Sequence, residues 1–477
     1  MKIFDTLSGK KIELKKSKKA INLFVCGPTV YDYSHIGHAR TYIFFDAFVK
    51  YLRSMNFQVY YLQNITDIDD KIINRAREKK ATPASVARKF EKEYLSDMKK
   101  LKITSVNKYA RATEHIKEIQ KQIAALIAKG FAYRTKNGVY FEIKKFNDYG
   151  GLSKQNIENL RAGWRVEPDP KKKDALDFAL WKITDVPAKT TDLREKKIKF
   201  KIVGGEPMWS SPWGWGRPGW HIEDTAITEK YFGPQYDIHG GGADLKFPHH
   251  EAEIAQQESA SGKKPLVKIW MHTGFLLVNG EKMSKSLNNF ITINDFLKKY
   301  PLEVLRIIAL SNHYHSPVYY TEESPKQALK NLETINEFLA KLKFVMENGK
   351  LEMGNGKKLM FGKYQKEFIN SLEDDFNTPK AFAVIFDLIS SLQKDVWRIS
   401  SKEAKITIKF LKEKLKIFGI EPKTAKIPLK IKVLAKKREK LRTYEQFTQA
   451  DRLRNKIKML GYVVEDTPFG QFVRKNF

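Results

Sequence analysis

An apolar run, a Gly-Pro loop, a helical pattern and a second apolar run follow one another near the start of the sequence. The two runs, AINLFVC at 20–26 and residues 58–63, have the composition of buried strands, and the helical pattern extends from about residue 38 to residue 55. A strand, a helix and a strand in this order almost always cross over right-handed and make a parallel sheet. Ligands bind such sheets at the carboxyl ends of the strands, so we expect Cys26 and the loop after it to face the functional site.

Charged helical patterns fill residues 70 to about 165 and end in a strand-like stretch at 139–143. They indicate an insertion, at about 75–170, between two halves of the sheet. We expect the second half to resume near Asp174, to continue through a tryptophan-rich turn and a strand near residue 236, and to lead into a helix that begins at Pro248, since proline suits a first helical position.

The chain has 477 residues, which is too long for one hydrophobic core, because single domains usually stop growing at about 250–300 residues. Lysine-rich helical patterns follow the sheet, and two basic helices with an extended tail end the sequence. We predict an α/β fold: a Rossmann-like parallel-sheet domain at 1–310 that contains the insertion, an all-helical domain at 311–422 and a small α+β module at 430–477.

Lys and Arg outnumber Asp and Glu by 87 to 55, which gives a formal net charge of +32. Such a field attracts a polyanion, so nucleic acid is the expected partner, although a proteome that is basic throughout would also explain the charge. Cys26 is the only cysteine, which excludes an intrachain disulfide and suits a reducing compartment. Without a run of about 18 apolar residues or a signal core, the chain is expected to be cytoplasmic, with no membrane partner.

Two histidines stand at the start of the predicted helix, in the stretch SHIGHAR at 34–40. His35 and His38 lie where backbone amides and the helix dipole favour anions, and their imidazoles can donate to phosphate oxygens in a transition state. Gly37 leaves room for a purine against the backbone. Two histidines at a helix start are more often structural, but the strand, loop and helix around this pair favour a catalytic role, which we predict for both.

A second basic motif, KMSKS, occupies residues 282–286 in a loop after an apparent strand at 274–278. Lys282 and Lys285 can close over a triphosphate and neutralise the charge that develops as pyrophosphate leaves. Alone, two such lysines would indicate only a solvated basic loop. Together with the histidine motif earlier in the chain, they predict a catalytic role for both lysines and an ATP contact for Lys285.

A HIGH-type motif followed by a KMSKS-type motif resembles the class I aminoacyl-tRNA synthetases. Longer stretches along essentially the whole chain are similar to the cysteinyl-tRNA synthetase family: FVCGPTVYDYSHIGHAR (24–40), NITDIDDKI (64–72), SPWGWGRPGWHIE (211–223), HGGGADLKFPHHEAEIAQ (239–256), WMHTGF (270–275), DDFNTP (374–379) and ADRLRNKIKMLGYVVEDTP (450–468). The resemblance implies an ATP-dependent ligase that activates L-cysteine as its adenylate and transfers it to the 3′ end of tRNA(Cys). It also implies Mg²⁺ with ATP, and a monomer.

The resemblance further implies a zinc site, which the family builds from two cysteines, a histidine and a glutamate. Cys26, His249 and Glu253 match three of these positions, and the last two are four residues apart, on one face of a helix. Asp224 stands where the family has its second cysteine, which leaves the formal charge of the site unchanged. Carboxylate oxygen binds zinc at about 2.0–2.2 Å, against about 2.3 Å for sulfur. We expect one zinc ion per chain with Asp224 as a ligand; the alternative is that Asp224 only caps a helix and the metal is lost.

Other roles follow from the same resemblance. The residues implied to contact the amino acid are Cys26, Gly27, Thr66 and Trp220. Those implied to bind ATP or the adenylate ribose are Gly37, Gly242, Asp244 and Lys285, although Asp244 could instead cap the following helix.

The carboxy-terminal tail is similar to the segment with which the family reads the anticodon. A carboxylate such as Asp466 can accept a hydrogen bond from a guanine edge, and an aromatic ring can stack on a base. The family's usual tryptophan is replaced by Val473, so either Phe472 takes over the stacking or recognition is weaker.

Two other functions compete with this reading. The cysteine ligase of mycothiol synthesis resembles this family, but it joins cysteine to an amino sugar and lacks a tRNA-reading carboxy-terminus. Because this chain has such a segment at residues 430–477, that function is disfavoured. A noncatalytic tRNA-binding relative without its metal would explain Asp224, but the complete SHIGHAR and KMSKS motifs argue against it.

Overall fold

The computed structural model describes residues 1–155, 172–184, 198–283, 287, 289–349, 361–423 and 426–475. The chain divides into two compact units, one formed by residues 1–297 and 314–319 and the other by residues 298–313 and 320–477. Within the described part of the chain, no helix is both long enough and apolar enough to span a bilayer.

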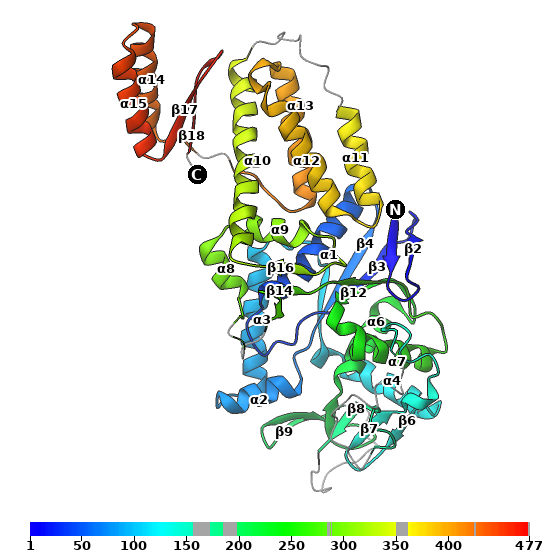
Figure 1. Ribbon diagram of the computed structural model, residues 1–477. Coiled ribbons are helices and arrows are strands. Elements are labelled where there is room, and N and C mark those ends of the chain that lie inside the picture. Colours follow the sequence, from blue (N-terminus) through cyan, green and yellow to red (C-terminus); the bar gives the residue numbers. More distant parts are fainter. Residues whose placement is uncertain are drawn as a thin grey trace. The chain divides into compact units, whose positions relative to one another are not determined.

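A five-stranded parallel sheet forms the centre of the first unit (Figure 1). Its strands, in spatial order, are β13 (Val267–Thr273), β12 (Tyr236–Gly242), β3 (Ile21–Val25), β4 (Val59–Ile65) and β5 (Lys108–Arg111). Helix α1 (Ile36–Ser54) connects β3 to β4, and α7 (Glu251–Ser261) lies between β12 and β13. The strand, helix and strand predicted at residues 20–63 are therefore confirmed, and the sheet contains a second unit of the same kind.

Two helices connect β4 to β5. They are α2 (Asp70–Glu78) and α3 (Pro83–Lys100). The sequence predicted only helices in this part of the chain, but β5 closes one edge of the parallel sheet. Its four residues, KYAR, are too few and too polar for an alternating pattern to reveal them.

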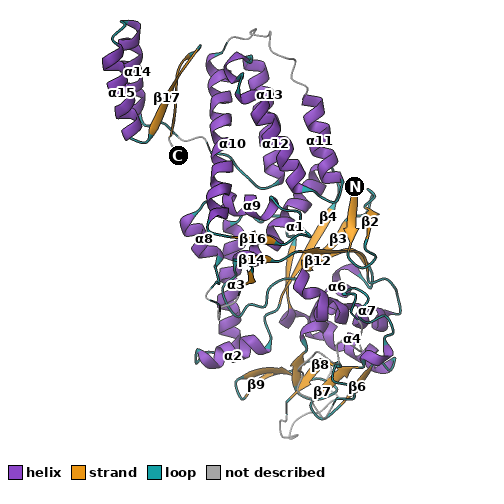
Figure 2. Ribbon diagram, viewed as in Figure 1, coloured by secondary structure: helices purple, strands orange, loops and turns teal. Residues whose placement is uncertain are grey.

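A six-stranded antiparallel sheet forms from chain segments between β5 and β12 (Figure 2). Its strands, in spatial order, are β6 (Ala132–Arg134), β7 (Gly138–Phe141), β8 (Phe178–Ile183), β11 (Gly216–Pro218), β10 (Glu206–Trp209) and β9 (Phe200–Val203). The expectation that the parallel sheet resumes near Asp174 is wrong, because β8 pairs with β7 and β11 instead. The parallel sheet resumes at β12.

Helices α4 (Ile116–Ala128), α6 (Trp220–Phe232) and α7 pack against one another beside the sheet. Buried polar contacts join them, since Thr225 of α6 donates to Gln122 of α4 at 2.7 Å. A π-helical turn, Lys246–His250, precedes α7, so the helix expected to begin at Pro248 begins as this turn. Outside the two sheets, the part of the chain up to residue 320 also contains β1 (Lys2–Asp5), β2 (Lys10–Glu13), β14 (Leu276–Val278), β15 (Glu281–Lys282), α8 (Ile293–Lys299) and β16 (Val318–Tyr320).

The second unit is mainly helical and ends in a small α+β module. Its helices are α9 (Leu302–Leu310), α10 (Glu323–Asn348), α11 (Phe361–Glu373), α12 (Thr378–Gln393), α13 (Ser401–Ile417), α14 (Leu429–Thr443) and α15 (Phe447–Met459). The predicted extended tail is a hairpin of β17 (Tyr462–Thr467) and β18 (Gly470–Lys475). The predicted fold class, a parallel-sheet domain with an insertion followed by helices and a small α+β module, is confirmed.

Candidate active site and metal cluster

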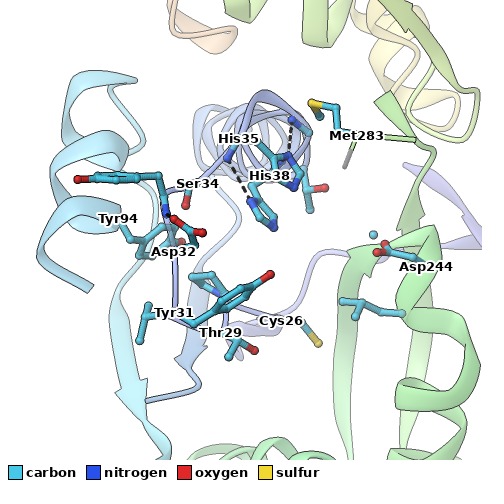
Figure 3. A pocket seen from close by; sticks show the side chains of 18 of the residues that line it. Cys26, Thr29, Tyr31, Asp32, Ser34, His35, His38, Tyr94, Asp244 and Met283 are labelled. Atoms are coloured by element: carbon cyan, nitrogen blue, oxygen red, sulfur yellow. Dashed lines mark hydrogen bonds between the residues drawn. The ribbon is translucent and has the colours of Figure 1, made fainter. Parts of the chain in front are cut away.

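The carboxyl ends of β3, β12 and β13 open into a cavity of about 730 Å³ (Figure 3). Cys26 and Gly27 lie in its wall directly after β3, as the topology predicted. Both sequence motifs also reach this wall, through His35, Gly37, His38, Lys282 and Met283. The cavity therefore brings together residues that are far apart in the sequence.

His35 and His38 form a reciprocal cap at the start of α1. The Nδ1 atom of His35 accepts from the backbone N–H groups of Gly37 and His38, at 3.1 and 3.3 Å, while Nδ1 of His38 accepts from the backbone N–H of His35 at 3.3 Å. The two rings are stacked with their centres 3.7 Å apart. Since Nδ1 is an acceptor in each ring, each neutral ring carries its proton on Nε2.

Burial keeps both imidazoles uncharged at neutral pH. It lowers the pKa of His35 to about 2, with further lowering by the positive charges that His38 and Lys282 can carry. Burial also lowers the pKa of His38 to about 4, against the opposing effect of Asp244. The pair thus presents two neutral N–H donors rather than cations.

Gly37 has no room for a side chain. A Cβ atom there would lie 2.8 Å both from Nδ1 of His35 and from the terminal methyl of Met283. The absence of a side chain lets the loop that carries Met283 approach the start of α1. Any planar group bound against this backbone would use the same space.

Lys282 faces the cavity from β15. Its Nζ lies 3.4 Å from the carboxylate of Asp244 and 5.0 Å from the centre of the Phe275 ring. Asp244 lies in a short 3-10 turn after Gly242. Among the described residues, its carboxylate accepts from the side chain of Lys282 rather than from a helix amide. Lys285, the second lysine of the motif, lies outside the described residues.

Arg40, the last residue of the SHIGHAR motif, has a positioning role that the motif alone did not predict. Its guanidinium is buried and donates to the backbone carbonyls of Gly274, Phe275, Tyr314 and Ser316. Gly274 and Phe275 directly follow β13 and lead into β14. Arg40 therefore ties α1 to the chain segment that carries Lys282.

The four predicted metal ligands come together in the interior, with ligand atoms that all lie within 4.8 Å of one another: Cys26, Asp224, His249 and Glu253. Nε2 of His249 lies 3.1 Å from Oδ2 of Asp224 and 3.0 Å from Oε1 of Glu253. Sγ of Cys26 lies 3.5 Å from Asp224 and 3.9 Å from Glu253. All four side chains are almost completely buried.

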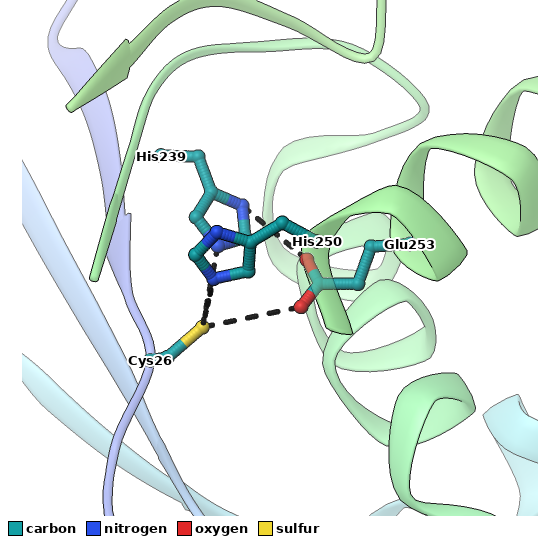
Figure 4. A group of neighbouring side chains, drawn as sticks. All are labelled: Cys26, His239, His250 and Glu253. Atoms are coloured by element: carbon teal, nitrogen blue, oxygen red, sulfur yellow. Dashed lines mark hydrogen bonds and ion pairs between the residues drawn. The ribbon is translucent and has the colours of Figure 1, made fainter. Parts of the chain in front are cut away.

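Two further histidines lie close to the same sulfur atom, and neither was predicted as a site residue. Nε2 of His239 lies 3.3 Å from Sγ of Cys26, and Nε2 of His250 lies 3.2 Å from it (Figure 4). With Cys26 and Glu253 they make a second set of four ligand atoms within 4.8 Å. The stretch HGGGADLKFPHHEAE contains both: His239 lies within β12, and His250 directly follows the predicted ligand His249.

The residues present fit a divalent cation. Oδ1 of Asp224 is buried without a hydrogen-bond partner, which is costly for a carboxylate oxygen unless a cation satisfies it. Burial raises the pKa of Glu253 to about 7, and burial with the nearby Glu253 and Asp224 raises that of Cys26. A cation would stabilise the charged forms of these groups, and a set of one thiolate, one imidazole and two carboxylates suits zinc.

The predicted amino-acid contacts surround this cluster. Gly27 lines the cavity, and a Cβ atom there would lie 1.8 Å from the backbone oxygen of Asn64, so only glycine fits. Trp220 also lines the cavity, and its ring stacks on His249 with the centres 4.2 Å apart. Thr66 is buried and donates a hydrogen bond to Glu223, so its side chain lies behind the cavity wall and does not line the cavity itself.

The two predicted anticodon contacts lie in the carboxy-terminal hairpin. Asp466 pairs with Arg438 of α14. Phe472 is 4% exposed and packs against Phe344 and Trp397, with ring centres 5.5 Å apart in each case. A ring buried in this way offers little free surface to a base, which favours the alternative that Phe472 does not take over the stacking.

Two exposed aromatic rings lie elsewhere in the same module. Tyr444, which directly follows α14, is 74% exposed, and Phe447, the first residue of α15, is 51% exposed. The guanidinium of Arg442 lies 5.7 Å from the centre of the Phe447 ring. The adjoining helices are rich in lysine and arginine, so aromatic and basic side chains occur together here. In the sequence, the feature that could have pointed to this surface is the pair of aromatic residues, Tyr444 and Phe447, where two basic helical segments meet.

Comparison with known proteins agrees with this arrangement. Residues 12–330 match the family model described as tRNA synthetases class I (C) catalytic domain, and residues 367–421 match the DALR domain. The cysteine–tRNA ligase of Thermoplasma acidophilum is 45% identical over 468 residues, and that of Thermococcus kodakarensis is 44% identical over 486 residues. Each alignment covers 98% of both chains.

Solved structures of other class I enzymes share the fold. Mycobacterium tuberculosis methionyl-tRNA synthetase in complex with methionyl-adenylate superposes with a TM-score of 0.61 at 16% identity, over 84% of this chain and 90% of that chain. A leucyl enzyme of Agrobacterium radiobacter superposes with a TM-score of 0.62 at 11% identity, over 84% and 83%. With the family match over residues 12–330 and the similarity along nearly its whole length, the chain belongs to the cysteinyl-tRNA synthetase family of class I aminoacyl-tRNA synthetases.

Proposed function

We propose that the chain is the ligase that joins L-cysteine to tRNA(Cys) at the expense of ATP, as a monomer in the cytoplasm. One observation carries the proposal: the cavity lined by His35 and His38 of SHIGHAR and by Lys282 and Met283 of KMSKS also contains Cys26, the sulfur atom of the buried cluster of candidate metal ligands. Phosphate chemistry and recognition of a thiol are thereby combined in one site.

In the first step, the cysteine carboxylate attacks the α-phosphate of ATP and pyrophosphate leaves. The Nε2–H groups of His35 and His38 donate to phosphate oxygens, and as neutral donors they stabilise the developing charge without changing their own protonation. Lys282 and Lys285 neutralise the departing pyrophosphate, with Mg²⁺ bound to the nucleotide. Catalysis then rests on positioning and on charge stabilisation.

Zinc held by Cys26, Asp224, His249 and Glu253 would supply a Lewis acid that favours a substrate thiolate over an alcohol. The protein's own contribution is to hold these ligands in a buried, rigid arrangement. Trp220 stacks on His249 and fixes its ring. Gly27 packs directly against the backbone of Asn64 and lines the cavity beside Cys26. Thr66 supports this wall through Glu223.

The adenosine end of ATP is assigned to the side of the cavity formed by Gly242 and Asp244, away from the side assigned to cysteine. Asp244 can accept from both ribose hydroxyls once Lys282 turns toward the phosphates, and Gly242 gives the ribose access to the backbone. A Cβ atom on Gly242 would lie 2.5 Å from the Asp244 carboxylate and would displace it. Gly37 similarly leaves a flat surface for the purine.

In the second step, the terminal ribose hydroxyl of tRNA attacks the adenylate carbonyl, AMP leaves and the hydroxyl proton passes to solvent. We propose that residues 1–310 carry out both steps, and that residues 311–422 and 430–477 bind the tRNA. Phe447 and Tyr444 are the better candidates to stack on anticodon bases, since their rings are exposed beside Arg442. Asp466 contributes by holding the hairpin against α14. Its side chain is also 43% exposed, so its carboxylate could accept a hydrogen bond from a base edge.

Exchange of radioactive pyrophosphate into ATP, tested with each amino acid in turn, is the direct experiment. We expect exchange with cysteine and not with serine, and charging of tRNA(Cys) in a second assay. Exchange without charging, but with ligation to an amino sugar, would indicate the other cysteine ligase. Binding of tRNA without any exchange would indicate a noncatalytic relative.

A further inference from the structure

The cavity extends beyond the motifs to a wall that none of the proposed roles uses. Four residues of α2 line this wall: Lys71, Asn74, Arg75 and Glu78. Their spacing of three and four residues puts them on one face of the helix, while Ile72, Ile73 and Ala76 are buried on the other side. One polar face of α2 is therefore turned toward the reaction centre.

Lys71 provides a cation beside the catalytic histidines. Its Nζ lies 5.5 Å from the centre of the Tyr31 ring, and no described carboxylate forms an ion pair with it. Lys71 and His38 line the same cavity, and the positive charge of Lys71 is one of the causes that lower the pKa of His38. A lysine in this position is available to an anion that enters the cavity.

The remaining groups of the wall are polar or aromatic. Arg75 pairs with Asp32 at 3.0 Å and with Glu78 at 3.1 Å, yet its Nε is buried without a hydrogen-bond partner. Tyr33 is 38% exposed and meets Phe90 edge to face. Asn74 is exposed one turn from Lys71. The wall thus combines a lysine without an ion pair, hydrogen-bonding groups, the exposed ring of Tyr33 and the half-buried ring of Tyr31.

We propose that this α2 wall, formed by Tyr31, Tyr33, Lys71, Asn74 and Arg75, receives the single-stranded 3′-terminal nucleotides of tRNA. The inference rests on the proposed function and assigns the place where the second substrate enters. Single-stranded nucleic acid is bound by stacking on aromatic rings and by cations that contact phosphates, which is the chemistry of this wall.

The position of the wall supports this occupant over ATP or cysteine. The transfer step requires the terminal ribose next to the cysteinyl-adenylate, in the same cavity. Cysteine is assigned to the side of Cys26 and Trp220, and ATP to the side of Asp244 and Lys282. The α2 wall is assigned to neither small substrate, and it lines the same cavity as His38.

The variant Lys71→Gln removes the free cation and keeps an exposed polar side chain, so the fold should be retained, as a thermal melt would check. We expect cysteine-dependent pyrophosphate exchange within about twofold of wild type. Transfer from preformed cysteinyl-adenylate to tRNA should slow by about tenfold, the effect of one lost charge-assisted contact. The salt dependence of tRNA binding should fall by about 0.7 in its log–log slope, as for one lost phosphate contact on a single strand.

Lys79→Gln is the matched control, because Lys79 is an exposed lysine at the end of the same helix and does not line the cavity. A second comparison uses tRNA that lacks its three terminal nucleotides. Wild type and Lys71→Gln should bind this truncated tRNA with equal affinity, whereas they differ on the intact tRNA.

Three results would overturn the inference: an unchanged transfer rate, a difference that persists on truncated tRNA, or a raised KM for ATP in the exchange reaction, which would assign Lys71 to the nucleotide. Failure of the proposed function looks different. In that case wild-type protein itself would show no cysteine-dependent exchange, and the inference would fall with it.

Discussion

Arg438 donates two hydrogen bonds to the carboxylate of Asp466, over N–O distances of 2.7 and 2.9 Å. The Arg438 side chain has no exposed surface, and its hydrogen bonds hold the pKa of Asp466 below its usual range. The pair fastens β17 to α14, so Asp466 supports the hairpin independently of any contact with tRNA.

Replacing Asp466 by alanine should destabilise the carboxy-terminal module. The buried guanidinium loses its partner, which costs about 1–3 kcal/mol. Urea unfolding of the full chain would measure the change, with Asp451→Ala, an exposed carboxylate on α15, as the control. Equal stability of the two variants would mean that the pair contributes nothing.

Substitutions of His35 can separate its role as the cap of α1, through Nδ1, from its role as a donor to phosphate, through Nε2. Asparagine places an acceptor where Nδ1 lies and keeps the cap, whereas glutamine places a donor nearer Nε2 and loses the cap. His35→Asn should leave stability unchanged and slow pyrophosphate exchange by about 10²-fold. His35→Gln should retain more activity but lose about 1 kcal/mol of stability. If the two variants lose activity equally, the donor is not on Nε2.

The metal site can be tested through Asp224. Purified protein should contain one zinc ion per chain, and Asp224→Ala should bind zinc at least about 10–100-fold more weakly. Asp224→Cys should retain the ion and, with cobalt in its place, absorb more strongly in the thiolate charge-transfer region. Equal metal content in wild type and Asp224→Ala would show that Asp224 is not a ligand, and would direct attention to His239 and His250.

Acid should destabilise the first unit through the paired histidines. An unfolded histidine titrates near pH 6.5, but the folded pKa values are about 2 for His35 and about 4 for His38. Below pH 6.5 the unfolded chain therefore binds more protons than the folded chain, so this contribution to stability is fully present above pH 6.5 and is lost as the pH falls. Melting temperatures between pH 7.5 and 4.5 would measure the slope. It should be shallower in a variant with asparagine at both positions.

Phe447→Ala should weaken charging of tRNA without affecting the activation of cysteine. Loss of one stacked base costs about 1–3 kcal/mol, or roughly 10- to 100-fold in kcat/KM for tRNA. Phe472→Leu is the contrasting variant, because a buried ring should affect stability and not tRNA binding. The opposite pattern would assign the stacking contact with the anticodon to Phe472.

The features predicted correctly from the sequence are those that depend on local residue patterns or on long motifs. The unit of β3, α1 and β4 followed from apolar runs of strand length around a helical period, and Cys26 was placed at the site because parallel strands present ligands at their carboxyl ends. The ligand set of Cys26, Asp224, His249 and Glu253 came from the family resemblance, and the structure brings the four together.

What escaped prediction depends on contacts between distant segments. Strand β5 is short and polar, so its place in the sheet follows only from pairing with β4. Strand β8 has the composition of a parallel-sheet strand but pairs with β7 and β11. Phe472 and Val473 are neighbours on a strand, and a sequence does not reveal which of two adjacent side chains faces the interior until the partners are known.

Cys26 carries the only thiol of the chain, and that thiol is buried. A second cysteine introduced on the surface would then be the one sulfur open to a thiol-reactive dye, without any need to remove a native residue first. A fluorophore placed near the outer end of α2 could report the arrival of the acceptor strand in real time, while the buried sulfur stays unlabelled and the enzyme remains intact.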